Sequence, residues 1–206
     1  METFNRYFAC TLLLIALLLN GQSKVMAAAT ENNDSAIDAA TAALPKSARE
    51  YHLKAAFLRY VAKFVEWPSE SLSEGIINIC VIGQVPYYKG IDSINGKVID
   101  DKQIKILKID NLNDVEKQCQ ILFVAKTETD NIDNIIKAIQ DKSVLGFGDM
   151  DHFAEKGGDM NFYIMNNRLA IMINPPAVER SQLKISPRML KLVTVVPPIN
   201  QGNIYN

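Results

Sequence analysis

Three short, almost wholly apolar runs, separated by longer stretches, constrain this fold more than any other feature. They read "IINICVIG" (76–83), "QILFVAK" (120–126) and "SVLGFGD" (143–149). Runs this short, closed by glycine or polar residues, are typical of strands buried on both faces of a sheet. Between the second and third runs, isoleucines recur at helical spacing, at positions 132, 135, 136 and 139. Alternation of such strands with helices predicts an α/β fold of three layers, in which a mostly parallel sheet carries helices on both faces.

The last third of the chain predicts an antiparallel addition to that sheet. "MNFYIM" and "RLAIMIN" are two strand-like runs joined by Asn166-Asn167, an asparagine pair that tolerates the positive φ of a tight hairpin. We expect this hairpin at the edge of the sheet. Two short helices follow in "PPAVERSQ" and "SPRMLKLV", each with proline near its start, where the missing N–H costs nothing.

The first residues have the pattern of an export signal. An apolar run from Tyr7 to Leu19 follows a short start containing Arg6, and small residues come after it at 27–29. The run is too short to span a bilayer, which needs about 20 residues. An export lipoprotein is the competing interpretation, but Cys10 precedes the apolar core instead of following it. We therefore predict a cleaved signal peptide over residues 1–27 and an exported, soluble mature protein without a transmembrane segment.

The remaining chain has the size of one ordinary domain. Residues 28–46 are small and polar with no apolar period, which predicts a disordered lead-in. The domain is expected over residues 47–196, because Ser47 and Glu50 form a capping box for a first helix. Residues 197–206 are expected to be a flexible tail. The formal net charge of −1 argues against nucleic acid and against a strongly anionic membrane as partners.

The cysteines indicate one disulfide. Cleavage of the signal peptide would remove Cys10 and leave only Cys80 and Cys119. Two cysteines in an oxidising compartment most economically pair with each other, and two buried free thiols are the alternative.

Catalytic groups are scarce. The chain has only two histidines, no serine in a G-x-S-x-G elbow, and a "GFGDMD" run in which Asp151 replaces the third glycine of a dinucleotide loop. Asp149, Asp151 and His152 could form a metal site, but a strand end followed by a helix N-cap explains the aspartates without a ligand. A helix C-cap explains Gly157-Gly158 in the same way. We expect no enzyme activity, no cofactor and no metal.

The helix before Pro68 carries the widest apolar surface. In "YHLKAAFLRYVAKFVEWP" (51–68) apolar side chains fill an arc of about 180°, more than one stripe resting on a sheet requires. Deep burial is one explanation, and contact with a second chain on the outer side is the other. The second explanation places a partner or dimer interface at Phe57, Tyr60, Val61, Phe64 and Trp67, because large aromatic residues often anchor interfaces.

These segments, taken in order, resemble the YfiR-like family of bacterial periplasmic regulators. The resemblance runs from about Tyr51 to Val196 and rests on "LKAAFLRYVAKFVEWP", "INICVIG", "GKVIDDKQIKI", "CQILFV", "VLGFGDMDHFAEKGGDMNFYI" and "NNRLAIMINPPAVERSQLKISPRMLKL". It implies an exported, non-enzymatic, dimeric α/β protein that binds the periplasmic sensor domain of an inner-membrane diguanylate cyclase and represses it. Lower cyclic-di-GMP and less biofilm would follow.

The resemblance also assigns residues. Cys80 and Cys119 match a pair of family positions that form a disulfide. Other recurring motif positions are matched by Trp67, Gly157, Gly158, Arg168, Asn174 and Leu183. The chain lacks the second cysteine pair that some members carry near "HFAEKGG", and with it any redox control that rests on that pair.

A periplasmic small-ligand sensor is the alternative function. In that hypothesis a small-molecule effector sets the repression, and Trp67 and Arg168 hold an anionic or aromatic ligand by stacking and charge.

Overall fold

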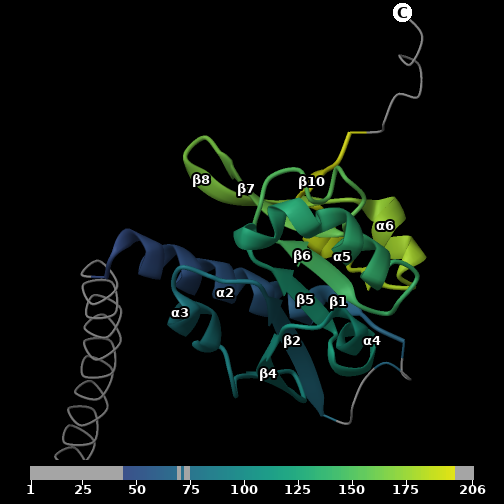
Figure 1. Cartoon of the computed structure of the whole chain (residues 1–206), viewed down its shortest axis with the longest axis horizontal. Coiled ribbons are helices and arrows are strands. Elements are labelled where there is room, and N and C mark those ends of the chain that lie inside the picture. The colour runs from purple at the N-terminus through teal and green to yellow at the C-terminus, as the bar shows by residue number, and fades with distance from the viewer. Residues whose placement is uncertain (1–43, 69–70, 72–74, 198–206) are drawn as a thin grey trace, which may run out of the picture. The chain divides into compact units, whose positions relative to one another are not determined.

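The computed structural model describes residues 44–68, 71 and 75–197 (Figure 1). The predicted signal peptide, most of the lead-in and most of the tail lie outside the described residues. The chain divides into two compact units, 1–49 and 50–206. Residues 44–49 are the described part of the first unit and include the first turn of helix α2 (Lys46–Phe64). All of the described strands belong to the second unit.

The second unit is built on an eight-stranded sheet in the order β10-β8-β7-β6-β5-β2-β4-β3. Pairing is parallel from β4 through β2, β5 and β6 to β7, whereas β7 with β8 and β3 with β4 are antiparallel. The predicted α/β fold with a mostly parallel sheet is therefore confirmed. The strands of this sheet are β2 Ile76–Ile82, β3 Val98–Ile99, β4 Lys102–Ile109, β5 Ile121–Val124, β6 Leu145–Gly148, β7 Met160–Met165, β8 Arg168–Ile173 and β10 Thr194–Val195.

The apolar runs of the sequence form the centre of the sheet. Every residue of β5 and β6 is buried, as the predicted strands with two covered faces require. β4 alternates instead, with isoleucines buried and lysines largely at the surface, because this strand lies next to the short outer strand β3. Hydrophobic pattern alone therefore located the central strands.

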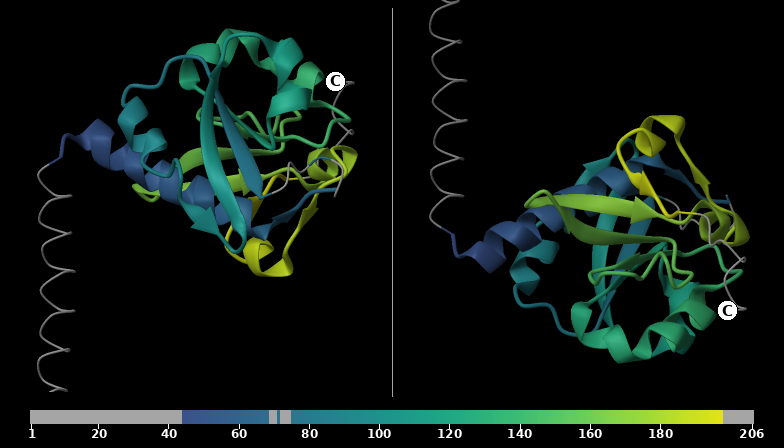
Figure 2. Two further views of the ribbon diagram at one scale, coloured as in Figure 1. Left: turned by 90° about the horizontal axis from the view of Figure 1, so that it is seen from below. Right: turned by 90° about the horizontal axis from the view of Figure 1, so that it is seen from above.

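Helices cover both faces of the sheet, as predicted. One core cluster joins α2, through Leu58 and Val61, to Ile79 of β2. The other joins helices α4 and α5 to the opposite face of the same strand, through Cys80, because successive side chains of a strand point to opposite faces. In both views of Figure 2, α2 lies on the opposite side of the strands from α4 and α5. The shorter helices are α3 Tyr88–Asp92, α4 Val115–Gln118, α5 Ile132–Ile139, α6 Pro175–Arg180 and α7 Pro187–Leu190.

The predicted hairpin is present, with one difference. β7 and β8 pair up to Met165 and Arg168, and the two residues between them, Asn166 and Asn167, have φ values of 49° and 60°. This is the backbone that a two-residue turn with twisted strands requires. The hairpin is not the outermost part of the sheet, because β10 pairs in parallel with the end of β8. Strands of two residues carry too little hydrophobic pattern to be read from sequence.

One further strand pairing and two 3₁₀ helices are not predicted by the hydrophobic pattern of the sequence. β1 (Val65–Glu66) continues α2 and pairs with β9 (Lys184–Ile185) in a separate two-stranded sheet. Two 3₁₀ helices, η2 (Leu112–Asp114) and η3 (Lys126–Asn131), follow β4 and β5.

The glycine pair after "HFAEK" does not cap a helix, because residues 151–157 form turns. Gly157 has a φ of +110°, and a side chain at Gly158 would bring its Cβ within 2.2 Å of the Phe153 ring. The helix prediction is wrong here. Gly157 supplies a backbone conformation that side chains disfavour, and Gly158 lets the chain cross the Phe153 ring closely.

Candidate functional site

Most of the apolar side chains of helix α2 pack inside its own domain. Val61 has an exposed fraction of 0 % and packs in the core on the α2 side of the sheet. Phe57, Phe64 and Trp67 are half-buried and pack against the same core. Tyr60, with 42 % of its surface exposed, is the one clearly displayed member of the five-residue set predicted for an interface. We therefore leave Val61 out of the candidate surface.

A groove follows the outer side of α2. Two neighbouring cavities, of about 500 Å³ and about 260 Å³, share Lys63, Ile99 and Asp100 in their walls. Tyr60 and the 54 % exposed Val98 line the larger cavity, and the ring of Trp67 lines the smaller one. We call this surface the α2 groove. It contains two of the predicted interface residues, Tyr60 and Trp67.

The α2 groove carries charges of both signs. Arg59 and Lys63 line it one turn apart on the helix with Asp100 opposite them, and Glu66 and Lys102 line the smaller cavity. Arg59 Nη2 donates to the Val98 carbonyl oxygen at 3.0 Å, and Lys63 lies 3.3 Å from the Asp100 carboxylate. These contacts fix two of the cations along an apolar floor. Such a surface fits an amphipathic segment with acidic side chains.

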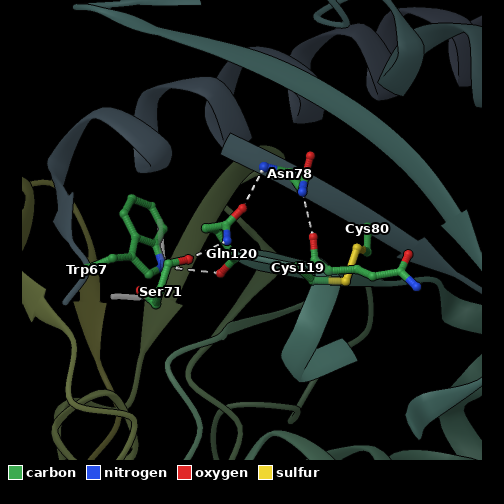
Figure 3. Close-up of a disulfide and its surroundings, with 7 residues drawn as sticks. Trp67, Ser71, Asn78, Cys80, Cys119 and Gln120 are labelled. Carbon is green, nitrogen blue, oxygen red and sulfur yellow. Dashed lines mark hydrogen bonds between the residues drawn. A yellow bond between two sulfur atoms is a disulfide. The ribbon is translucent and has the colours of Figure 1, made fainter. Parts of the chain in front are cut away.

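Trp67 is held in place from its buried side (Figure 3). Its indole Nε1 donates to the Gln120 carbonyl oxygen at 3.2 Å. The Gln120 side chain, itself buried, accepts from the Asn78 backbone N–H at 2.8 Å and donates to the Ser71 carbonyl oxygen at 2.7 Å. The tryptophan is thus part of a network that ties the end of α2 to the start of β5.

The predicted disulfide lies beside this network. Cys80 of β2 and Cys119, the residue before Gln120, are bonded, with their Cα atoms 5.6 Å apart. Both cysteines are buried in the core on the α4 and α5 side. The covalent bond therefore joins neighbouring parts of the sheet close to the anchored tryptophan.

Trp67 and Arg168 do not share a ligand site. Trp67 is bonded to the residue before β5, at the amino end of the parallel strands. Arg168 is exposed at the β7–β8 turn, and β7 extends beyond the carboxyl end of β6, where Phe147 pairs with Met160. The two residues lie toward opposite ends of the sheet, so the predicted pair cannot close on one small molecule.

A buried charged cluster connects α2 to the end of β6. Lys54 Nζ lies 2.5 Å from Asp149 Oδ1, and Tyr51 donates to Asp149 Oδ2 at 2.6 Å. Lys54 and Asp149 are 5 % and 7 % exposed, and Glu50 also pairs with Lys54. Burial raises the pKa of the Asp149 carboxyl, although Lys54 and Tyr51 both oppose that shift. Burial and the bond to Asp149 likewise raise the pKa of Tyr51.

Sequence reasoning missed this cluster. The sequence pattern predicts a helix cap for Asp149 and no particular role for Lys54. The signal was present, because Lys54 falls on the helix face that also carries Leu58 and Val61. A lysine in the middle of a core-facing stripe requires a buried partner.

The remaining polar residues of this segment do not gather around a metal. Asp151 and His152 are exposed, and His152 pairs with Glu155. Among the described residues, no group of three His, Cys, Asp or Glu side chains could hold a metal ion.

Asn174 and Leu183 make contacts that hold the domain together. Asn174 accepts from the Ala177 N–H at the start of α6 and donates to the Ala154 carbonyl oxygen at 2.8 Å. Leu183 is buried in the core beneath α2. Asn174 thus ties α6 to the turn segment after β6.

The fold is a mostly parallel α/β domain with a groove along α2, and comparison with known proteins gives its family. Residues 51–194, more than half of the chain, match the family described as YfiR/HmsC-like. The chain belongs to this family, which is regulatory rather than catalytic. No curated protein matches the chain.

Two solved structures are similar over part of the chain, and the first of them supports the fold. A conserved domain protein from Vibrio cholerae O1 biovar El Tor has a TM-score of 0.50 and 12 % sequence identity, covering 71 % of this chain and 60 % of that one. An ABC domain in complex with L-Trp from Streptococcus pneumonia has a TM-score of 0.46 and 10 % identity, covering 62 % and 57 %. This chain thus spans less than two thirds of either protein. In the part of the chain that the structure describes, no helix is long and apolar enough to cross a membrane.

Proposed function

We propose that this protein is a periplasmic negative regulator of an inner-membrane diguanylate cyclase. It binds the periplasmic sensor domain of the cyclase and represses synthesis, which lowers cyclic-di-GMP and biofilm formation. Family membership supports a regulatory role, and the signal peptide predicted over residues 1–27 supports export. The proposal includes no catalytic step.

The observation that carries the proposal is the α2 groove. Exposed apolar side chains of Tyr60 and Val98 stand over a cavity of about 500 Å³. Two cations, Arg59 and Lys63, and one acid, Asp100, line that cavity together with His52, so it suits an acidic amphipathic segment of the sensor domain. Bound apolar side chains would supply affinity by excluding water, and the cations would supply orientation and a salt-sensitive association rate.

The proposal is tested by titrating the purified protein with the periplasmic sensor domains of the organism's membrane diguanylate cyclases in a calorimeter. Tyr60→Ala combined with Val98→Ser is expected to weaken binding about tenfold or more, because buried interface anchors each cost over ~1 kcal/mol when truncated. Ile164→Ser is the matched control, since Ile164 is also an exposed apolar residue, at 64 %, but lies on the hairpin. Equal binding by all variants would remove the groove from the proposal.

A homodimer is part of the same proposal. Exposed apolar residues outside the groove and away from the β7–β8 hairpin, among them Leu190, Leu192 and Val195, offer surface for a second copy. Sedimentation velocity over a hundredfold concentration range is expected to show a dimer. A monomer throughout would restrict the regulator to one copy per sensor domain.

A further inference from the structure

A cavity of about 500 Å³ lies at the carboxyl ends of three parallel strands. Its walls come from the residues after β2, from those after β4 and from η3, which follows β5. After β2 the chain passes to α3, on the α2 side of the sheet, and after β5 it passes to α5, on the other side. Two adjacent strands whose connections leave in opposite directions create a crevice, and open α/β sheets bind ligands in such crevices.

At this crevice, a glycine allows the end of β2 and the helix η3 to approach each other closely. Gly83 has a φ of +82°, and a Cβ at this position would lie 2.7 Å from Thr127 Oγ1 and 2.8 Å from Glu128 Cγ. The Gln84 N–H donates to Thr127 Oγ1 at 2.9 Å. Glycine therefore lets η3 lie directly over the end of β2, and the hydrogen bond holds the two walls together.

The ionisable side chains that line the crevice are both acidic. Asp110 and Glu128 are its two ionisable groups, and the other polar side chains are amides, including Gln84 and Asn131. Asn131 Nδ2 donates to Glu128 Oε2 at 3.1 Å, which orients that carboxylate. Asp110 makes no hydrogen bond or ion pair with any described residue. Carboxylates without a cationic partner form their strongest hydrogen bonds with a cationic donor.

The rest of the lining is apolar. Ile82 and Ile109 are almost fully buried, and half-buried Leu112 lies beside them. Leu112 therefore offers most of the apolar surface on which an alkyl stem can rest while its charged end reaches the carboxylates. A cavity of this volume is within the usual range for small-molecule sites.

We infer that this crevice, which we call the β2–β5 crevice, binds a small aliphatic amine. The ammonium group pairs with Asp110 and Glu128, and the methylene chain lies over Leu112, beside Ile82 and Ile109. Ligands with a carboxylate, such as free amino acids, are rejected by the same two acids. The site differs from the α2 groove in every lining residue, so the inference does not rest on the proposed binding of a cyclase.

The test uses putrescine as the amine, with lysine and 1-butanol as comparison ligands. Calorimetric titration of the whole protein is expected to show binding of putrescine and neither comparison ligand. Asp110→Asn and Glu128→Gln are each expected to raise the dissociation constant about tenfold, since hydrogen bonds to charged groups contribute about 1.5–3 kcal/mol. Asp92→Asn and Asp141→Asn, exposed acids outside the crevice, are the charge-matched controls and are expected to bind normally.

A measurement on the unaltered protein keeps the inference testable if a variant fails to fold. Putrescine is expected to shift the amide resonances of Gly83, Gln84 and Asn131 more than those of the α2 groove. No binding at millimolar putrescine, or shifts spread over all surface acids, would overturn the inference. An equal loss in the control variants would do the same. Cyclase binding is measured separately, so either result leaves that proposal to its own test.

Discussion

At the scale of single residues, Lys54 and Asp149 determine how α2 is placed. The two charges lie 2.5 Å apart and nearly out of contact with water. Removing one partner of a buried pair leaves the other charge uncompensated, which typically costs about 3–5 kcal/mol, whereas removing both costs much less. The pair therefore specifies which face of α2 meets the end of β6, rather than adding much net stability.

Urea unfolding of Lys54→Met, Asp149→Asn and the double variant tests this role. We expect each single change to lower the free energy of unfolding by several kcal/mol, and the double variant to lose less than the sum of the two. Lys63→Met is the control, because Lys63 pairs with Asp100 at an exposed site and should lose less than about 1 kcal/mol. Additive losses at Lys54 and Asp149 would show that the pair is not coupled.

Asp159 gives a pH dependence to stability. Its carboxyl is 2 % exposed and accepts from the Gly146 N–H at 2.7 Å, and burial raises its pKa from 3.8 to about 7. The folded state therefore holds this proton more tightly than the unfolded state does. The contribution of Asp159 to stability is then fully present below the unfolded pKa and is lost as the pH rises toward 7, with a slope of up to ~1.4 kcal/mol per pH unit.

Replacing Asp159 by asparagine is expected to flatten that slope, because the amide stays neutral and still offers an oxygen to the Gly146 N–H. Urea midpoints between about pH 4 and pH 8 provide the measurement. Asp149 has a raised pKa too, so part of the slope will remain. A slope unchanged by Asp159→Asn would assign the pH dependence to other groups.

At the scale of elements, the disulfide fastens β2 to the start of β5. It closes a sequence separation of 39 residues, for which chain entropy predicts a stabilisation of about 3–4 kcal/mol. Cys80→Ser combined with Cys119→Ser is expected to lower the free energy of unfolding, measured in urea, by a matching amount without changing partner specificity. A non-reducing peptide map that finds both thiols free would contradict this account.

In the β7–β8 turn, the asparagine pair suits the positive φ values of the backbone. Asn167 has a φ of 60°, which a β-branched residue adopts only at a cost of about 1–3 kcal/mol. Asn167→Val is therefore expected to destabilise the protein by roughly that amount, and Asn167→Gly to be nearly neutral. Thermal midpoints of the two variants provide the comparison, and equal midpoints would argue against a strained turn.

At the scale of the whole molecule, the sequence predicted what depends on local pattern. The buried strands β2, β5 and β6 follow from short apolar runs, and the Asn166-Asn167 turn follows from backbone preference. The β1–β9 pairing and the Lys54–Asp149 contact join residues about a hundred positions apart. No local pattern encodes such contacts, so the buried cluster and the walls of the β2–β5 crevice required the structure.

At the candidate site, too, local sequence pattern predicted some features and others required the structure. The wide apolar arc of α2 drew attention to the helix, but it could not separate Val61, which the sheet covers, from Tyr60, which it leaves exposed. That difference depends on how α2 is rotated over the strands. The groove also needs Val98 and Asp100 from the β3 region, which no helical period could supply.

Repression of a cyclase is the central claim, and its output tests it most directly. Each membrane diguanylate cyclase of the organism, reconstituted with an accessible periplasmic domain, is assayed for cyclic-di-GMP synthesis with and without this protein. We predict that the unaltered protein and Ile164→Ser lower synthesis by one cyclase, whereas Tyr60→Ala with Val98→Ser restores it. Unchanged synthesis by every cyclase at saturating protein, or full repression by the groove variant, would contradict the account.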